Sequence, residues 1–236
     1  MKNENDVFGN AIADYFAEPN SANIKVKSPD FEEDEIPVPY LFRNFEEMPK
    51  IEQKALQLCK GKTLDVGCGA GSHSLYLQKQ NILVTAIDTS PKAIEVCIKQ
   101  GIKNAKLKDF FEFKNEKFDS LLFLMNGIGI VGKLENMQAF FDQIKLLLKP
   151  DGQVLLDSSD LIYLHKGNEE EAKNSPFYYG EMEYQIQYET FKSATFNWLY
   201  IDFESLAFFA ELYGFTAEKI MDGPHYDYLA KLTLQN

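Results

Sequence analysis

The chain has 236 residues, of which 45% are hydrophobic and 25% are charged. This mixture is typical of a globular protein and excludes a disordered or fibrous chain. At this length we expect one large domain, or one domain with a lid, whose core forms without a disulfide or a structural metal. The 24 basic and 36 acidic residues give a net charge of −12, and the lysines form no basic stripe. Nucleic acid is therefore not an expected partner.

The sequence also bears on compartment and metal content. No run approaches the ~18 apolar residues of a membrane span, so no membrane association is expected. Residues 1–6 carry no apolar signal segment, and we expect a cytoplasmic protein. The three cysteines, Cys59, Cys68 and Cys97, show no Cys-x-x-Cys spacing. A disulfide framework or a zinc site is therefore not expected, and no metal is predicted.

From residue 62 onward, short apolar runs alternate with helical periodicity. Helices are expected over 72–80, from Pro91 with Ile94, Cys97 and Ile98 on one face, over 134–148 up to a turn at 149–152, and over 203–213. The alternation predicts an α/β fold with a doubly wound, mostly parallel, seven-stranded sheet. Its strands are expected at 63–66, 83–87, 105–108, 118–124, 153–157, 215–221 and 228–234.

Two regions interrupt this alternation. Residues 1–50 contain five prolines and polar clusters, and we expect an irregular or partly helical cap ahead of a domain that spans 51–236. Residues 181–188 alternate apolar and polar side chains with a period of two, and 195–201 has the pattern of an antiparallel partner. We therefore expect a β-hairpin insert within 160–201, laid over one end of the sheet.

The most informative segment runs from Leu64 to Ser72 and reads LDVGCGAGS. It predicts a strand, a glycine-rich turn and then a helix. Glycines permit positive φ and let a ligand approach the backbone closely, while the helix N-terminus offers free N–H groups. Asp65 precedes the turn at a point where dehydrogenases usually carry an apolar residue. A carboxylate there suits a cationic ligand better than a pyrophosphate.

This run closely resembles motif I of the class I S-adenosylmethionine-dependent methyltransferases. Ala86-Ile87-Asp88 is similar to the family's second motif, whose acidic residue binds both ribose hydroxyls. Asp88 lies roughly 20 residues beyond the first glycine, as a βαβ unit requires. Lys108-Asp109-Phe110 resembles the adenine-edge motif, in which the carboxylate accepts from the exocyclic amine. Residues 148–153 look like the turn ahead of strand five, and 203–215 like the last helix and turn before the reversed strand.

The resemblance covers residues 62–158 and 202–234. It implies a sheet with a reversed last strand, and an enzyme that transfers a methyl group from S-adenosylmethionine to a small-molecule acceptor and releases S-adenosylhomocysteine. The residues that it implies for cofactor binding are Arg43, Asp65, Gly67, Cys68, Gly69, Gly71, His73, Asp88, Thr89, Asp109, Phe110, Met125, Asn126 and Gly127.

Each carboxylate also has a structural interpretation. Asp65 could be a structural acid facing a helix, Asp88 a helix cap, and Asp109 a turn former. Taken together, three carboxylates that follow successive strands indicate the crevice where open α/β sheets bind ligands. Two other functions stay open at this point. A nicotinamide-dependent oxidoreductase would share the glycine turn, but it predicts neither Asp65 nor Asp109, and a non-catalytic module would bind the cofactor without turnover.

Methyl transfer from a sulfonium depends on in-line alignment and exclusion of water more than on acid–base groups. Where amide- and base-methylating relatives carry an N/D-P-P-Y/F motif, this chain has Met125-Asn126-Gly127-Ile128. DNA adenine and glutamine amides are therefore not expected acceptors. Asp157 and Asp160 could be two ligands of a metal site, but the sequence does not supply the rest of the ligand pattern. If the acceptor must lose a proton, His165 in the insert is the expected general base.

The cap and the insert supply the remaining candidates. Arg43 has the charge to bind the methionine carboxylate, or to pair with Glu46 or Glu47. We expect the insert and the cap to enclose the acceptor pocket together, and to close when the cofactor binds. The aromatic residues that could either line that pocket or pack on the sheet are Tyr178, Tyr179, Tyr184, Tyr188 and Trp198.

Overall fold

The structure is a computed structural model that describes residues 6–19, 22–29 and 31–235. The described residues group into two compact units. One unit is built from Met1–Met48, Leu64–Phe113 and Glu183–Phe196, and the other from Pro49–Thr63, Lys114–Met182 and Asn197–Asn236. No helix in the described part of the chain is both long enough and apolar enough to cross a membrane.

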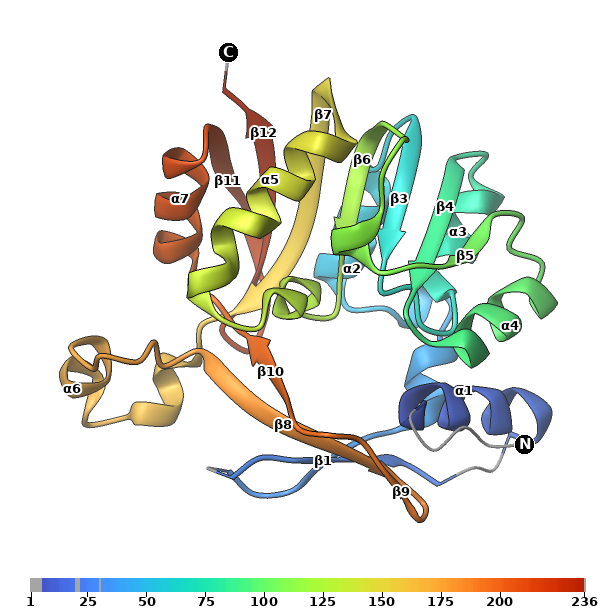
Figure 1. Cartoon of the computed structure of the whole chain (residues 1–236), viewed down its shortest axis with the longest axis horizontal. Coiled ribbons are helices and arrows are strands. Elements are labelled where there is room, and N and C mark those ends of the chain that lie inside the picture. The colour runs from blue at the N-terminus through green and yellow to red at the C-terminus, as the bar shows by residue number, and fades with distance from the viewer. Residues whose placement is uncertain (1–5, 20–21, 30, 236) are drawn as a thin grey trace. The chain divides into compact units, whose positions relative to one another are not determined.

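The larger sheet confirms the fold predicted from the sequence (Figure 1). β4 pairs with β5, and β6 with β7, in parallel, whereas β12 runs antiparallel to both β7 and β11. The sheet is therefore mostly parallel, and its last strand is reversed. Its strand order is β11 (Phe215–Asp222), β12 (Asp227–Leu234), β7 (Leu148–Ser159), β6 (Phe118–Phe123), β3 (Lys62–Val66), β4 (Leu83–Asp88) and β5 (Ala105–Leu107).

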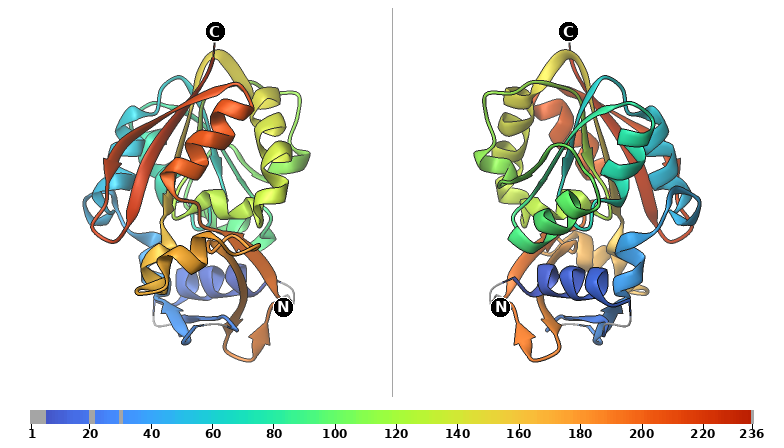
Figure 2. Two further views of the ribbon diagram at one scale, coloured as in Figure 1. Left: turned by 90° about the vertical axis from the view of Figure 1, so that its left-hand side faces the viewer. Right: turned by 90° about the vertical axis from the view of Figure 1, so that its right-hand side faces the viewer.

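In the second unit, helices cover both faces of the strands. α5 (Met137–Leu147) and α7 (Phe203–Leu212) lie on one face, and α2 (Lys50–Leu58) packs against β7 and β12 (Figure 2). Phe141 of α5 packs at 5.3 Å, between ring centroids, against both Phe215 and Tyr213. Because β6 is covered on both sides, its sequence is a nearly continuous apolar run.

In the first unit, α1 (Val7–Ala17) packs against α4 (Pro91–Lys99), and α3 (Ser72–Lys79) packs against β4. The sequence predicted one apolar face on α4, and this holds for Ile94 and Cys97, which are buried. It is wrong for Ile98, which is 57% exposed. The buried face of α4 is completed instead by Ala93 and Val96, so Ile98 points away from the core.

A smaller sheet contains the predicted hairpin. Its strands follow the order β10 (Phe196–Leu199), β8 (Glu181–Tyr188), β1 (Ile24–Lys27) and β2 (Asp34–Ile36), and β9 (Phe191–Lys192) pairs with β8. β1 pairs antiparallel with both β2 and β8. The cap, which the sequence predicted to be irregular or partly helical, thus contributes two short strands. Strands of four and three residues leave too little periodicity for sequence reasoning to detect.

Residues 149–152 are part of β7 and do not form the predicted turn at the end of a helix. Phe118 of β6 pairs with Leu148, and Ser120 pairs with Gln153, so the intervening residues of β7 form a bulge. The predicted helix over 134–148 begins with a 3-10 turn. The 3-10 helices and the remaining α-helix are η1 (Val38–Phe42), η2 (Phe45–Glu47), η3 (Phe110–Glu112), η4 (Gly127–Val131), η5 (Leu134–Asn136), η6 (Leu161–His165) and α6 (Glu169–Lys173).

A close contact between η4 and β10 gives a test of the packing in the second unit. A Cβ added at Gly129 would lie 2.0 Å from Cε2 and Nε1 of Trp198. Gly129→Ala should therefore lower the free energy of unfolding by about 1–3 kcal/mol, measured by urea denaturation. In a Trp198→Ala background the same change should cost much less, because the ring is gone. Equal stability of Gly129→Ala and the wild type would contradict this packing.

Candidate functional site

The glycine-rich turn between β3 and α3 leaves open space beside its backbone. Gly67, Gly69 and Gly71 have φ values of +70°, +53° and +91°, in the left-handed region that favours glycine. A Cβ added at Gly67 or Gly69 would meet no atom within 4 Å, whereas one at Gly71 would lie 2.3 Å from Cδ1 of Ile102. The first two glycines therefore form a cradle for a ligand, and the third allows the turn to pack on Ile102.

The turn is held by the end of β4. The backbone N–H groups of Gly67 and Cys68 both donate to the carbonyl of Ile87, at 2.9 and 3.0 Å. The N–H of Gly69 donates to Oδ2 of Asp88 at 2.9 Å. Backbone and side chain of two adjacent residues thus fix the turn. A ligand that binds there meets a largely preformed surface.

Asp88 combines a structural role with further acceptor capacity. Its Oδ1 accepts the N–H of Ser90 at 2.8 Å, while Oδ2 accepts the N–H of Gly69. A carboxylate has about four acceptor sites, so two such bonds leave room for ligand hydroxyls. Burial raises the pKa of Asp88, and the two backbone hydrogen bonds oppose this. Thr89, which follows it, is exposed.

The N-terminal helix brings a carboxylate that the sequence did not single out. Asp6 caps α1 by accepting the N–H of Gly9 at 3.0 Å, and its other oxygen accepts the N–H of Lys92 at 3.2 Å. It is buried, and its charge contributes to the raised pKa of Asp88. An aspartate three residues before a glycine, ahead of an apolar run, is the N-cap pattern that could have identified it.

Asp65 lies behind the turn and is 2% exposed. Ser74 of α3 donates its hydroxyl to Oδ2 of Asp65 at 2.6 Å. Burial raises the pKa of Asp65, and the electrostatic interaction with the nearby His73 opposes this. Asp65 therefore has the geometry of a structural acid facing a helix, one of the two roles that the sequence allowed. It is a buried carboxylate two residues before the first glycine of the turn.

The third carboxylate lies on the loop after β5. Oδ1 of Asp109 accepts the N–H of Phe111 at 2.8 Å and caps η3, while the side chain as a whole stays exposed. Phe110 is buried. The N–H of Lys108 donates to the carbonyl of Asp88 at 2.9 Å, which ties this loop to the end of β4. The first unit thus brings Asp65, Asp88 and Asp109 onto connected backbone segments.

Arg43 follows η1 and is buried in the first unit. Its guanidinium lies 3.9 Å from the ring centroid of Tyr40 and donates to the carbonyl of that residue. Ser72, at the start of α3, donates its hydroxyl to the carbonyl of Leu41 at 2.7 Å. This hydrogen bond joins the η1 segment to the helix that follows the glycine turn.

In the second unit, the segment after β6 has an unusual backbone. Met125 and Asn126 adopt φ values of +62° and +55°, which are strained for residues with a side chain. Both N–H groups donate to the buried carboxylate of Asp157, at 3.2 and 2.8 Å. Gly127 then begins η4 and is buried. Asp157, which the sequence offered only as a fragment of a metal pattern, is the anchor of this turn.

The histidine proposed as a base and the aromatic candidates occupy different environments. His165 ends η6 and is half-buried, with its ring centroid 6.2 Å from that of Tyr179. Trp198 packs on Gly129, and the Tyr188 hydroxyl donates to Asp14 at 3.1 Å. Among the described residues, no group of three or more His, Cys, Asp or Glu side chains is arranged to hold a metal ion.

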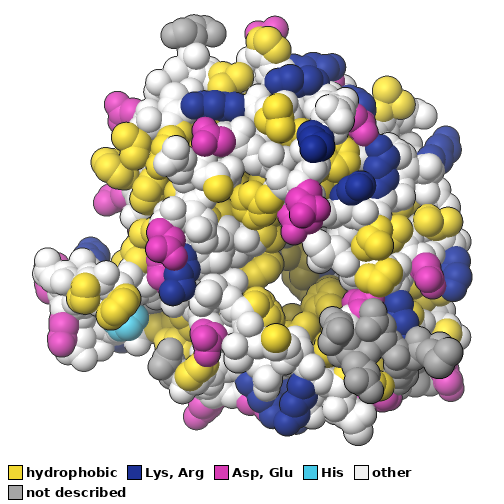
Figure 3. Space-filling view, viewed as in Figure 1, with side chains coloured by type: hydrophobic (Ala, Val, Ile, Leu, Met, Phe, Trp, Pro, Cys, Tyr) yellow, Lys and Arg dark blue, Asp and Glu magenta, His cyan; other side chains and the backbone are white. Residues whose placement is uncertain are grey.

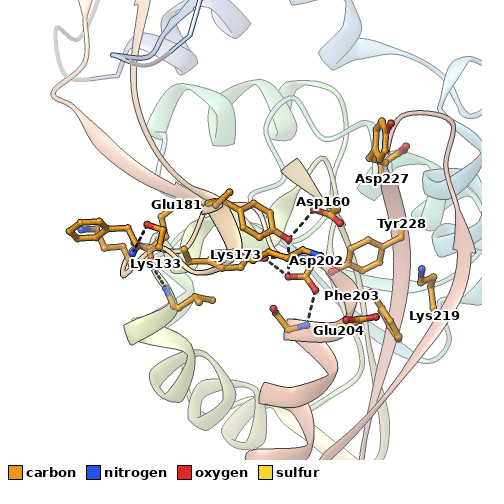
Figure 4. Close-up of a pocket in the computed structure, with 18 of the residues that line it drawn as sticks. Lys133, Asp160, Lys173, Glu181, Asp202, Phe203, Glu204, Lys219, Asp227 and Tyr228 are labelled. Atoms are coloured by element: carbon orange, nitrogen blue, oxygen red, sulfur yellow. Dashed lines mark hydrogen bonds between the residues drawn. The ribbon is translucent and has the colours of Figure 1, made fainter. Parts of the chain in front are cut away.

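The second unit also contains a cavity of about 1160 Å³ (Figure 4). Tyr178 and Tyr179 line it, together with Asp160 and Asp202. The Tyr178 hydroxyl donates to Oδ2 of Asp202 at 2.6 Å, and that of Tyr179 lies 3.0 Å from Oδ1 of Asp160. The aromatic residues that the sequence singled out in the insert are therefore divided: Tyr178 and Tyr179 line this cavity, and Trp198 packs on η4.

Charged side chains on the face seen in Figure 3 are interspersed. The lysines and arginines on that face lie among acidic groups and do not merge into one basic surface.

Comparison with known proteins adds to this geometry. A family model described as "Methyltransferase domain" matches residues 59–208. The crystal structure of a SAM-dependent methyltransferase from Bacteroides fragilis, in complex with S-adenosyl-L-homocysteine, is 45% identical to this chain. It matches 100% of this chain and 98% of its own chain, with a TM-score of 0.92.

Two curated relatives are more distant. A ubiquinone biosynthesis O-methyltransferase from Pasteurella multocida is 30% identical over 121 residues, which is 46% of this chain and 50% of the relative. A probable (S)-tetrahydroprotoberberine N-methyltransferase 2 from Papaver bracteatum is 30% identical over 113 residues, or 44% of this chain and 30% of the relative. The matches thus span half of these relatives or less.

The raised pKa of Asp65 predicts a pH dependence of stability. Below the ordinary aspartate pKa of about 3.9, the carboxyl is protonated in both the folded and the unfolded state. Folding retains the proton to higher pH, so the stability that Asp65 contributes is present in acid and is lost as the pH rises through the folded-state pKa. The free energy of unfolding of the wild type, minus that of Asp65→Asn, should therefore fall as the pH rises above about 4, the ordinary aspartate pKa.

Urea denaturation of the ligand-free protein at several pH values measures this difference. The control is Asp151→Asn, which removes one charge from an exposed position on β7. Its difference from the wild type should change little over the same range. If the Asp65→Asn difference stays constant or grows with pH, the Asp65 carboxyl is not held in its protonated form by burial.

Proposed function

Because this chain belongs to the class I S-adenosylmethionine-dependent methyltransferases, we propose that it transfers the methyl group of that cofactor to a small-molecule acceptor. The observation that carries the proposal is the cradle of Gly67 and Gly69, with Asp65 buried behind it and Asp88 at its edge. A Cβ would fill the open space beside either glycine. The residues present therefore fit a ligand that lies directly against the backbone.

Each carboxylate of the first unit would bind a different part of the cofactor. Asp88 would accept the ribose hydroxyls with the acceptor sites that Gly69 and Ser90 leave. Asp109 would accept the adenine amine, and the charge of Asp65 would favour the sulfonium end of the ligand. His73 and Ser74 hold Asp65 for that role. Arg43, Thr89, Phe110 and the segment 125–127 remain further proposed contributors.

When bound, S-adenosylmethionine supplies an electrophilic methyl group that an acceptor atom takes directly. The protein then has to align the acceptor with that methyl group and exclude water. The hydrogen bonds that fix the glycine turn on Ile87 and Asp88 hold the cofactor-binding backbone in place for this purpose. If the acceptor must lose a proton, we propose His165 as the base that takes it.

Two observations support a small-molecule acceptor. The curated relatives from Pasteurella and Papaver are named as methyltransferases of ubiquinone biosynthesis and of a tetrahydroprotoberberine. The residues after β6, Met125-Asn126-Gly127-Ile128, also lack the proline pair of amide- and base-methylating relatives. Membership of the family removes the support for a nicotinamide-dependent oxidoreductase. A non-catalytic cofactor-binding module keeps the same motifs, and only turnover distinguishes it.

The proposed role of Asp88 predicts a large loss of cofactor affinity when its carboxylate is removed. Asp88→Ala would lose two charge-assisted hydrogen bonds to the ribose, each worth about 1.5–3 kcal/mol, so S-adenosylhomocysteine should bind at least about tenfold more weakly. Titration calorimetry measures this affinity. Because Asp88 also holds the N–H groups of Gly69 and Ser90, circular dichroism must show that the variant folds. Asp88→Asn, which retains one oxygen, should lose less.

Several outcomes would contradict the proposal. Heat from NAD, and none from S-adenosylmethionine or S-adenosylhomocysteine, would overturn the cofactor assignment. Unchanged affinity in a folded Asp88→Ala variant would overturn the role of Asp88, and Asp151→Ala serves as the control for a lost surface charge. If the wild type binds the cofactor but forms no S-adenosylhomocysteine with any phenol, amine or carbon acceptor of a broad panel, the binding module is the better description.

The sequence also predicts that the cap and the insert respond to the cofactor. In the first unit, Asp6 ties α1 to the start of α4 beside Asp88, so ligand at Asp88 should stabilise α1. Hydrogen exchange, with and without S-adenosylhomocysteine, should show increased protection within 8–45 or 160–190 as well as at the glycine turn. If only the turn and the Asp88 loop respond, these segments do not close on the ligand.

A further inference from the structure

The cavity of the second unit is not explained by the proposed cofactor site. None of the residues expected to bind the cofactor lines it. Its wall comes instead from η5, Asp160 directly after β7, α6 and the segment that follows it, the start of β8, the start of α7 and the β11–β12 hairpin (Figure 4). Its volume of about 1160 Å³ lies slightly above the range of about 300–1,000 Å³ that is usual for small-molecule sites. It has room for a ligand of its own.

The described lining of this cavity is strongly acidic, with seven carboxylates and three lysines. One of these lysines, Lys219, already pairs with Asp222 at 3.0 Å. In the part of the chain that the structure describes, Asp160 and Asp202 have no lysine, arginine or histidine within ion-pair distance. At these two positions the cavity therefore carries negative charge that no basic side chain among the described residues neutralises.

Two tyrosines bring these carboxylates together. The Tyr179 hydroxyl lies 3.0 Å from Oδ1 of Asp160 and 3.3 Å from Oδ2 of Asp202, and its single proton serves one of them at a time. The Tyr178 hydroxyl donates its own proton to Asp202 and accepts the N–H of that residue at 2.8 Å. Two like charges thus face one phenol, and a cation between them would relieve their repulsion.

The start of α7 stabilises one of the two charges. Asp202 caps this helix by accepting the N–H of Ser205 at 2.9 Å. Burial alone would raise the pKa of Asp202, but the hydrogen bonds from Ser205, Tyr178 and Tyr179 together lower it. Asp202 therefore remains ionised in the cavity wall. Asp160 caps only the short η6, by accepting the N–H of Ile162 at 2.9 Å.

Aromatic faces complete the lining and already hold an ammonium group. The Lys219 Nζ lies 5.2 Å from the ring centroid of Phe203 and 5.9 Å from that of Tyr228. Both rings line the cavity, as do Tyr178 and Tyr179. Aromatic faces beside carboxylates are the combination that recognises organic cations. The position of Lys219 shows that the structure accommodates an ammonium group beside these two rings.

We propose that this cavity binds a small organic cation, an amine whose ammonium group lies at Asp160 and Asp202 and whose apolar body lies against the tyrosine rings. A cation matches the charge of the wall, and an apolar body matches its aromatic faces. The residues of this site belong to one compact unit of the protein. None of them is a residue proposed to bind the cofactor or to act as the base, so this inference stands apart from the proposed methyl transfer.

The test uses tyramine and benzyltrimethylammonium as probes, with p-cresol and 4-hydroxyphenylacetate as neutral and anionic analogues. Calorimetry on the full chain measures the affinity of each. Asp160→Asn and Asp202→Asn remove a charge but keep an oxygen that caps the following turn. Each variant should weaken the binding of both cations by about tenfold or more, since a charge-assisted contact is lost. Asp151→Asn, which removes an exposed charge outside the cavity, should leave the affinity unchanged.

The inference is supported if both cations bind, if both analogues bind at least about tenfold more weakly, and if the two cavity variants alone weaken the cations. It is overturned if neither cation binds, if p-cresol binds as tightly as tyramine, or if Asp151→Asn weakens binding as much as the cavity variants do. The last outcome would mean general attraction to an acidic surface. S-Adenosylhomocysteine titrated into each variant should bind as in the wild type, which shows that the fold is intact.

Discussion

The attachment of the glycine turn to the end of β4 is the constraint on which the first unit depends. The Ile87 carbonyl accepts two N–H groups of the turn, and the Asp88 side chain accepts a third. Since all three glycines have positive φ, the turn has a high conformational freedom to lose, and these bonds select one conformation. The same carboxylate that orders the turn is the one proposed to bind the ribose. The order of the turn and the proposed binding of the ribose therefore depend on the same carboxylate.

Buried carboxylates recur in both units and link the fold to its proposed chemistry. Asp65 and Asp88 have raised pKa values because burial disfavours their charge. Their ionised forms cost stability that the rest of the fold must supply, and a cationic ligand would recover part of it. Asp157 has a different role, since it accepts the N–H groups of Met125 and Asn126, whose backbone conformation after β6 is strained. Aspartates thus have a proposed role in ligand binding in one unit, and one of them fixes backbone geometry in the other.

Sequence reasoning predicted what periodicity and local motifs encode. The strands of the large sheet and the turn at Gly67–Gly71 follow from patterns of a few adjacent residues, whereas the reversed last strand was implied by the family resemblance. It missed features that depend on distant partners. β1 is a strand because β8 lies beside it, and Asp6 reaches the N–H of Lys92, 86 residues away. It also misassigned Ile98, since helical spacing alone does not decide which side of α4 is covered.

The packing of Trp198 on Gly129 has a spectroscopic consequence. Trp198 is the only tryptophan of the chain. Its indole lies against η4, the short helix that directly follows the strained segment held by Asp157. Intrinsic fluorescence excited at the red edge of aromatic absorption therefore originates from one defined place. Without any label, the emission of this single ring reports whether the loop after β6 keeps its conformation.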